Sequence, residues 1–240
     1  MSSVYAPGMS AITKLDLAGL YAHATAVFRQ GGGTRPQVSL IELGSERAVL
    51  KDYSRSDPWF RFVIGPLITY REVRALRALR DIPGIPRLLR QVNRRAFLME
   101  YIEGVTPREQ DQARPFASPE MFERLYELVQ AMHARGVAHC DLRSGGNTII
   151  DKQGQPYVVD FVSNFVRGSA WNLAWRWAFD RFCEADIVAV ARLKKRLVPD
   201  MLTPAERQNL QREQQSRLAY WARRTGQSIR NISRFFLTRR

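Results

Sequence analysis

Two aspartates and an asparagine occur at fixed spacing in the stretch "HARGVAHCDLRSGGNTIIDKQGQPYVVDF", residues 133–161. Asp141 follows a helix signal and lies in a loop, where a carboxylate can orient a substrate hydroxyl or accept its proton. Asn147 and Asp160 are expected close together, and two oxygen ligands on neighbouring strands suit Mg²⁺, which fills the rest of its octahedron with water and phosphate oxygens. This set of side chains indicates phosphoryl transfer, in which the protein mainly positions groups and neutralises charge.

Two predicted elements position these residues. The segments "NTII" and "PYVVDF" flank the turn "DKQGQ", which predicts a hairpin with Asn147 on one arm and Asp160 on the other. Ser118 is the predicted N-cap of a helix that begins at Pro119 and keeps one apolar face until it ends at Gly136. This helix leads directly into the loop that carries Asp141.

The first hundred residues predict a sheet and one helix. The segments "ATAVFRQ", "QVSLIEL" and "RAVLKDY" are predicted as an antiparallel meander, with glycines 31–33 and Gly44 in its turns. A helix is expected with Pro66 at its first position, ending near "DIPGIP". A further strand pair, "RLLRQV" and "AFLMEYI", precedes Gly104. Beyond residue 200, Thr203 and Glu206 predict a capping box for a helix that reaches about residue 224.

The motifs "HCDLRSGGN", "VVDF" and the upstream "AVLK" resemble the catalytic loop, the metal-binding motif and the strand lysine of the protein-kinase-like fold. The resemblance covers roughly residues 24–190. It implies an α+β, bilobal protein-kinase-like fold with an antiparallel-sheet N-lobe over residues 1–104 and a mainly helical C-lobe over residues 105–204. Residues 205–240 would then form a basic C-terminal helical extension.

The resemblance also implies ATP and Mg²⁺ as cofactors and a role for each motif residue. Asp141 corresponds to the catalytic base or orienting group, and Arg143 to a charge stabiliser for the γ-phosphate. Asn147 and Asp160 correspond to the metal ligands. His139 would support the backbone around the metal-binding aspartate.

Further nucleotide-binding residues follow from the same resemblance. Lys51 would bind the α and β phosphates and be held by Glu72, about twenty residues later on the predicted helix. The segment "LMEYIEG" is similar to the hinge between the kinase lobes, with Glu100 and Ile102 as candidates to hold adenine. The candidates for the loop that covers the phosphates are Gly31, Gly32 and Gly33.

The sequence departs from the kinase pattern at three places. Asn147 lies six residues after Asp141, whereas protein kinases place this asparagine five residues after the aspartate. Val162 replaces the glycine of the metal-binding motif, and glycines 31–33 do not form a GxGxxG pattern. These departures keep open a catalytically inactive pseudokinase that acts as a binding module.

The acceptor is expected to be a hydroxyl group of a sugar. No "APE" motif and no long activation segment follow Asp160, and protein substrates normally dock on that part. The short tail resembles the small bacterial lipopolysaccharide-core kinases that phosphorylate heptose or Kdo, which are relatives of the RIO kinases. We therefore expect a lipid-linked sugar as acceptor. The alternatives are a RIO-like serine/threonine protein kinase, the pseudokinase, and an RNA-associated RIO-like protein that only the basic charge favours. Nucleic acid is otherwise not an expected partner.

Composition adds expectations about partners and location. A net charge of +14 favours an anionic partner, and residues 214–240 interleave arginines with apolar side chains and contain no acid, which suits an anionic membrane surface or packing on the core. Trp171, Trp175 and Trp177 are expected in the core, with a sugar-binding platform as the alternative. The chain has two cysteines and neither an apolar run of membrane-spanning length nor a signal peptide, so we expect a cytoplasmic protein, peripheral on the inner face of the membrane.

Overall fold

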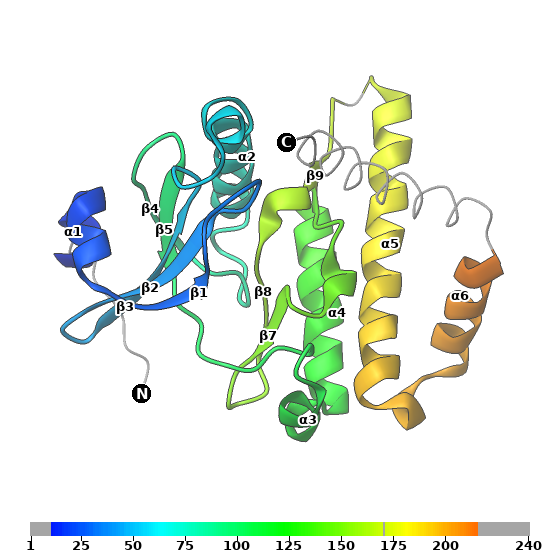
Figure 1. The fold of residues 1–240 in the computed structure, drawn as a ribbon. Coiled ribbons are helices and arrows are strands. Elements are labelled where there is room, and N and C mark those ends of the chain that lie inside the picture. Colours follow the sequence, from blue (N-terminus) through cyan, green and yellow to red (C-terminus); the bar gives the residue numbers. More distant parts are fainter. Residues whose placement is uncertain (1–10, 170, 216–240) are drawn as a thin grey trace.

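The structure is a computed structural model that describes residues 11–169 and 171–215 of the 240-residue chain. A lobe built on an antiparallel sheet lies beside a mainly helical lobe (Figure 1). The predicted α+β class and the bilobal arrangement are therefore confirmed. The predicted domain boundaries at residues 104 and 204 stay predictions, and the side chains of residues 214–240 lie outside the described part.

Five antiparallel strands form the sheet in the order β1-β2-β3-β5-β4, which confirms the predicted meander and strand pair. Strand β3 lies in the middle of the sheet. Leu50 on β3 packs into an apolar cluster with Leu20 of the short helix α1, while the next residue, Lys51, points to the opposite face because side chains alternate along a strand. The bounds are α1 Leu17–Ala22, β1 Ala24–Arg29, β2 Gln37–Leu43, β3 Glu46–Asp52, β4 Leu88–Gln91 and β5 Ala96–Glu100.

The helix of this lobe, α2 (Gly65–Ala78), does not begin at Pro66 as expected. It follows a π-helical turn, η2 (Phe60–Ile64), in which the backbone N–H of Gly65 donates to the carbonyl of Phe60. Proline has no N–H to donate, and its ring collides with the carbonyl four residues earlier in a regular α-helix. The wider π turn gives Pro66 that space, so helical structure extends through a proline that the sequence pattern places at the start.

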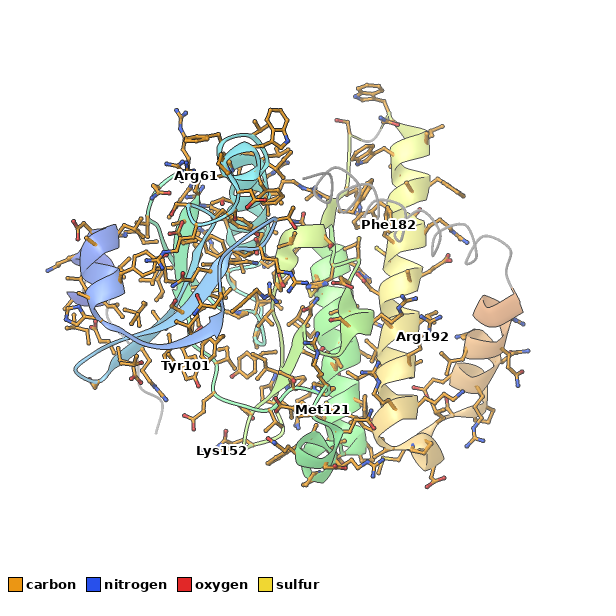
Figure 2. All side chains as sticks on the ribbon, viewed as in Figure 1. Arg61, Tyr101, Met121, Lys152, Phe182 and Arg192 are labelled. Atoms are coloured by element: carbon orange, nitrogen blue, oxygen red, sulfur yellow. The ribbon has the colours of Figure 1, made fainter. Side chains whose placement is uncertain are left out.

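The second lobe centres on two long helices that lie side by side, α4 (Pro119–Ala134) and α5 (Leu173–Leu197), with the hairpin of β7 and β8 between α4 and the sheet (Figure 1). The predicted N-cap is confirmed, since Ser118 Oγ accepts from the backbone N–H of Met121, which Figure 2 labels within this lobe. The predicted hairpin is also present. The remaining elements are η1 Ala11–Lys14, α3 Gln110–Ala113, η3 Arg114–Phe116, β6 Val137–Ala138, η4 Leu142–Ser144, β7 Thr148–Ile150, β8 Pro156–Val158, η5 Phe161–Ser163, β9 Phe165–Val166, η6 Pro199–Met201 and α6 Pro204–Gln215.

The predicted capping box begins α6. Thr203 N–H donates to Glu206 Oε2 over 2.7 Å, and Glu206 N–H donates to Thr203 Oγ1 over 3.2 Å. Leu210 of α6 packs with Ala191 of α5, so the start of the predicted extension rests on the helical lobe. Its predicted continuation to residue 224 lies outside the described residues. In residues 11–169 and 171–215, no helix is both long and apolar enough to cross a membrane.

Candidate active site

Lys51, Glu72 and Asp160 meet at the junction of the two lobes. Lys51 Nζ lies 2.7 Å from Glu72 Oε2 and 2.7 Å from Asp160 Oδ1. The side chains of Lys51 and Glu72 are each 3% exposed, whereas that of Asp160 is 26% exposed. Tyr53 Oη donates to the other carboxylate oxygen of Glu72 over 3.1 Å. The buried pair is therefore fixed in place, and Asp160 is the member of the triad that faces solvent.

The charges of these groups follow from their surroundings. Burial of Lys51 opposes its charge, but the carboxylates of Asp160 and Glu72 outweigh burial and raise the pKa of the ammonium. Burial also opposes the charge on Asp160, yet the attraction of Lys51 and of Arg29 lowers the pKa of this carboxyl below its ordinary value. Burial raises the pKa of Glu72. At neutral pH the site therefore presents a charged Lys51 and an ionised, partly exposed Asp160.

The loop between Asp141 and Asn147 absorbs its extra residue. It forms the 3-10 turn η4 and then turns at Gly145, which has a φ of +68° that glycine adopts without strain. Asn147 Nδ2 donates to the backbone carbonyl of Asp141 over 3.0 Å and to Asp141 Oδ2 over 3.2 Å. The two side chains are in contact despite the insertion, and Arg143 on η4 is exposed beside them.

Asp186 on α5 anchors the backbone before Asp141. Its carboxylate accepts from the backbone N–H of His139 over 2.7 Å and from that of Cys140 over 2.9 Å, and it lies 3.1 Å from His133 Nε2. Asp186 is 1% exposed. Asp186 is not recognisable from the sequence as part of the site, because it lies 45 residues beyond Asp141 on a helix whose pattern indicates only which of its own faces is apolar. The available signal was that Asp186 is the one acidic residue among the apolar positions of this helix that are buried, which indicates a buried carboxylate with a specific partner.

His139 connects the Asp141 loop to Asp160. Its Nε2 atom lies 2.9 Å from the carbonyl oxygen of Val159, and its ring packs edge-on against Phe161. The predicted support for the backbone around Asp160 is thus present as a direct contact on either side of that residue. Cys140 and Asp160 are the two described residues other than glycine with positive φ, at +68° and +65°. Such backbone strain is held by the surrounding contacts and is common at functional sites.

The segment after Asp160 has Val162 where the metal-binding motif of protein kinases has a glycine, and it forms a different turn. Residues 161–163 form the 3-10 turn η5, and the buried Asn164 closes it by donating from Nδ2 to the carbonyl of Phe161 over 2.6 Å. Arg71 of α2 donates to the carbonyl of Asn164. Because Glu72 is the next residue along α2, this contact ties the helix that carries Glu72 to the segment that carries Asp160.

Arg29 and the glycine-rich turn complete the N-lobe side. Arg29, the last residue of β1, places Nη1 3.9 Å from Asp160 Oδ2, a contact that sequence reasoning missed because β1 precedes Asp160 by more than a hundred residues. Gly31 packs so closely that a Cβ there would lie 2.8 Å from Arg55 Cβ. Gly33 accepts at its carbonyl from the N–H of Asp57 over 2.9 Å. The turn is therefore tied to residues 55–57, and its phosphate-binding role stays a prediction.

The predicted hinge follows β5. The backbone N–H of Glu100 donates to the carbonyl of Arg87 over 2.9 Å and its carboxylate contacts the same arginine, so Glu100 must use other atoms to bind a base. Ile102 is partly exposed two residues later. Between them Tyr101, labelled in Figure 2, stacks on Phe28 of β1 with ring centroids 6.2 Å apart. The hinge and the first strand therefore meet at an aromatic contact.

The tryptophans at the start of α5 contradict the expectation of a core position. Trp171, Trp175 and Trp177 are 83%, 45% and 59% exposed. Trp175 packs on Phe165 and donates from Nε1 to the carbonyl of Val166 over 2.9 Å. The reason for the error is that the apolar face of α5 begins only at Phe179, so the first turn of the helix projects beyond the core.

The oxygen donors fit a magnesium ion that is held partly by a nucleotide. Asp160 is ionised, and Asn147 lies on the facing hairpin arm, where its backbone carbonyl accepts from the N–H of Val159 over 2.9 Å. In the described part of the chain, no group of three or more His, Cys, Asp or Glu side chains can enclose a metal ion. Mg²⁺ typically takes one or two protein ligands and completes its shell with water and phosphate oxygens.

Comparison with known proteins finds likeness in structure alone. No protein-family model matches the chain, and no curated protein matches it by sequence. The crystal structure of the Rio2 kinase from Chaetomium thermophilum aligns with a TM-score of 0.56 at 15% identity, over 82% of this chain and 66% of that chain. The Rio2 kinase-ADP/Mg2+-phosphoaspartate complex from Chaetomium thermophilum aligns with a TM-score of 0.55 at 16% identity, over 81% and 66%.

The fold is protein-kinase-like. In this kinase-like fold the N-lobe holds the five-stranded sheet and α2, and the C-lobe holds α4, α5 and the β7–β8 hairpin. The chain spans just under two thirds of the length of the Rio2 chains that it matches. The likeness confirms the predicted fold class. It carries no information on the lipopolysaccharide-core type or on the acceptor.

Proposed function

We propose that the protein transfers the γ-phosphoryl group of ATP to a hydroxyl group. The observation that carries this proposal is the contact of Asn147 with Asp141 in the same site that holds Lys51 and Asp160 together. Lys51 binds the α and β phosphates, and Glu72 holds its ammonium in position. Bound Mg²⁺, held by Asn147 Oδ1 and the Asp160 carboxylate, would neutralise charge on the phosphates.

Asp141 acts on the acceptor. Its carboxylate orients the attacking hydroxyl and takes its proton, while the hydroxyl oxygen bonds to the γ-phosphorus and the bond from that phosphorus to the β–γ bridging oxygen breaks. The electron pair of the broken bond stays on ADP. Arg143, exposed two residues after Asp141, stabilises the charge on the transferred group.

The inactive pseudokinase is the weaker reading. Its main support is the extra residue before Asn147, but the turn at Gly145 returns Asn147 to Asp141. Asp186 holds the backbone before Asp141, and His139 holds the backbone before Asp160. Catalysis needs both side chains fixed in position in this way.

We infer that the acceptor is a sugar rather than a protein. Residues 161–172 connect Asp160 to α5, which leaves little chain for docking a peptide. The exposed Trp171 and Trp177 stand at the end of this connection and offer flat faces for the C–H groups of a sugar ring. A lipopolysaccharide-core sugar fits these features. A protein acceptor is the second candidate, supported by the likeness in fold to Rio2 kinase.

A lipid-linked acceptor requires a membrane surface, and an exposed apolar stripe on the N-lobe supports one. Arg61 stacks over the ring of Phe62, and Arg95 lies over the same ring, so basic groups border the stripe (Figure 2 labels Arg61). Aromatic and basic side chains together suit the interface of an anionic bilayer. The stripe, 45–74% exposed, consists of Trp59, Phe62, Val63, Leu67 and Tyr70.

Vesicle binding tests the membrane part. The protein should sediment with vesicles of phosphatidylcholine and phosphatidylglycerol, and both the Trp59→Ser/Leu67→Ser variant and removal of residues 214–240 should weaken that binding. Met201→Ser, an exposed apolar change in the C-lobe, serves as the control. Equal binding by the stripe variant and the control would remove the stripe from the proposal.

Transfer of label tests the activity itself. The protein is incubated with γ-labelled ATP, Mg²⁺ and a cell-envelope extract, with the Asp160→Asn variant in parallel, and label is separated into glycolipid, protein and free phosphate. Label in glycolipid that disappears in the variant supports a sugar kinase. Label in protein identifies the second candidate, and label that does not depend on Asp160 contradicts the proposed function.

A further inference from the structure

Two arginines from distant parts of the chain lie against the loop between Asp141 and Asn147. A Cβ added to Gly145 would lie 2.6 Å from Arg196 Nη1, and one added to Gly146 would lie 3.2 Å from Arg108 Nη2. Arg108 precedes α3, and Arg196 is in the last turn of α5. The two guanidinium groups therefore contact adjacent glycines, and any side chain at either glycine would displace them.

Three arginines bring positive charge to this loop. Arg196 Nη2 donates to the backbone carbonyl of Arg143 over 3.4 Å, which brings a third arginine to the same turn. Like charges repel one another, so a concentration of guanidinium groups around one turn is stabilised when an anion binds there.

A hydroxyl donor lies in the same turn. Ser144 Oγ is buried and has no hydrogen-bond partner among the described residues. Polar atoms that are buried usually have a partner, so the unpaired Ser144 hydroxyl is a donor of this turn that the described residues leave unsatisfied. Arginine guanidinium groups and hydroxyls are the donors that commonly bind phosphate and carboxylate oxygens.

The arginines border the loop that carries Asp141. Gly146 directly precedes Asn147, whose Nδ2 is 3.2 Å from Asp141 Oδ2, so Arg108 contacts the residue before the side chain that touches the proposed catalytic carboxylate. The nucleotide phosphates are assigned to Lys51 across the junction between the lobes.

We propose that Arg108 and Arg196, with the Gly145–Gly146 backbone between them, form an anion subsite for the acceptor. The acceptor carries a phosphate or a carboxylate near the hydroxyl that is phosphorylated, and this group binds the two guanidinium groups while Asp141 holds the hydroxyl. The inference rests on the proposed function, because it defines the acceptor of the same site.

Phosphate binding tests the subsite separately from catalysis. Inorganic phosphate is titrated into protein saturated with ADP and Mg²⁺, and its binding is followed by the broadening of its ³¹P resonance. Arg108→Gln and Arg108→Gln/Arg196→Gln should raise the dissociation constant of phosphate about tenfold or more through the loss of charge-assisted hydrogen bonds. ADP affinity should stay the same. Arg80→Gln, a change at an exposed arginine after α2, is the control.

Transfer assays decide whether the bound anion belongs to the acceptor. In the same variants, transfer of label to the envelope acceptor should fall about tenfold, with the loss in kcat/KM for the acceptor, while hydrolysis of ATP by water is unchanged. Weaker phosphate binding with unchanged transfer would overturn the proposal in favour of a site for free phosphate. A matching loss of ADP affinity would assign the arginines to the nucleotide. Failure of the unmodified protein to bind ADP would contradict the proposed function itself.

Discussion

Asn147 Nδ2 lies 3.2 Å from Asp141 Oδ2, although six positions separate the two residues. The additional residue relative to protein kinases is taken up by η4 and by the left-handed turn at Gly145. Because Nδ2 of Asn147 is used on Asp141, Oδ1 is the atom that remains to bind a cation. The insertion therefore changes the path of the loop and leaves its two functional side chains together.

Asp141→Asn should separate nucleotide binding from transfer. The amide keeps the size of the side chain but cannot take the acceptor proton, so transfer should fall about 10²- to 10⁴-fold while the affinity for ATP stays the same. Calorimetric titration with ATP and a labelled-transfer assay measure the two effects. Asp111→Asn, at an exposed position on α3, serves as the control. Unchanged transfer would remove Asp141 from the mechanism.

Lys51→Met should destabilise the fold more than the double change Lys51→Met/Glu72→Leu. Without Lys51 the buried Glu72 carboxylate has lost its counter-charge, which costs about 3–5 kcal/mol of unfolding free energy. Removing the carboxylate as well relieves part of that cost. Urea unfolding of both variants measures the difference. A double variant that is less stable than Lys51→Met would contradict the assigned role of the pair, and both variants should lose ATP binding.

Asp186→Ala should lower both stability and turnover. The change leaves the backbone N–H groups of His139 and Cys140 buried without an acceptor, at about 1–3 kcal/mol each. The loop that carries Asp141 then shifts, so kcat should fall while the KM for ATP is unchanged, because Lys51 is not affected. Asp180→Ala, an exposed change on the same helix, is the control. A rise in the KM for ATP without a loss of kcat would contradict this positioning role.

The contribution of Glu206 to stability should disappear in acid. Burial opposes its charge, but hydrogen bonds from Thr203, Lys194 and Tyr126 outweigh burial and lower the pKa of Glu206. A lowered carboxyl pKa stabilises the fold above the unfolded-state value of about 4.3, and this contribution is lost as pH falls through the folded-state pKa.

Glu206→Gln should therefore cost about 1 kcal/mol at pH 7, and the difference from the unmodified protein should shrink below about pH 4. Urea unfolding at a series of pH values measures it, with Glu127→Gln, an exposed change on α4, as the control for the loss of one charge. A difference that is constant down to pH 3 would contradict the assigned interaction.

The sequence predicts those residues of the site that stand in short motifs of neighbouring residues. Lys51, Glu72, Asp141 and Asp160 are recognised because each stands in a short motif on its own predicted element, and the structure brings Lys51, Glu72 and Asp160 into direct contact. Their catalytic roles stay predictions.

Contacts that join distant segments are not predictable in this way. Asp186 reaches the backbone of His139 and Cys140 from another helix, and Arg29 approaches Asp160 from the first strand. The start of α2 was misplaced because a π turn accommodates Pro66, and periodicity does not reveal such a turn. The tryptophans of α5 were misplaced because the pattern does not reveal how far a helix projects from its neighbours.

The most direct measurement is calorimetric titration of ATP with and without Mg²⁺ into the unmodified protein and the Asp160→Asn variant. Asp160 is the ionised carboxylate next to both Lys51 and the hairpin arm of Asn147, so binding of ATP should strengthen with Mg²⁺ in the unmodified protein. The variant should lose that dependence on Mg²⁺. Absence of ATP binding, or the same dependence on Mg²⁺ in both proteins, would contradict a phosphoryl-transfer site at Asp141, Asn147 and Asp160.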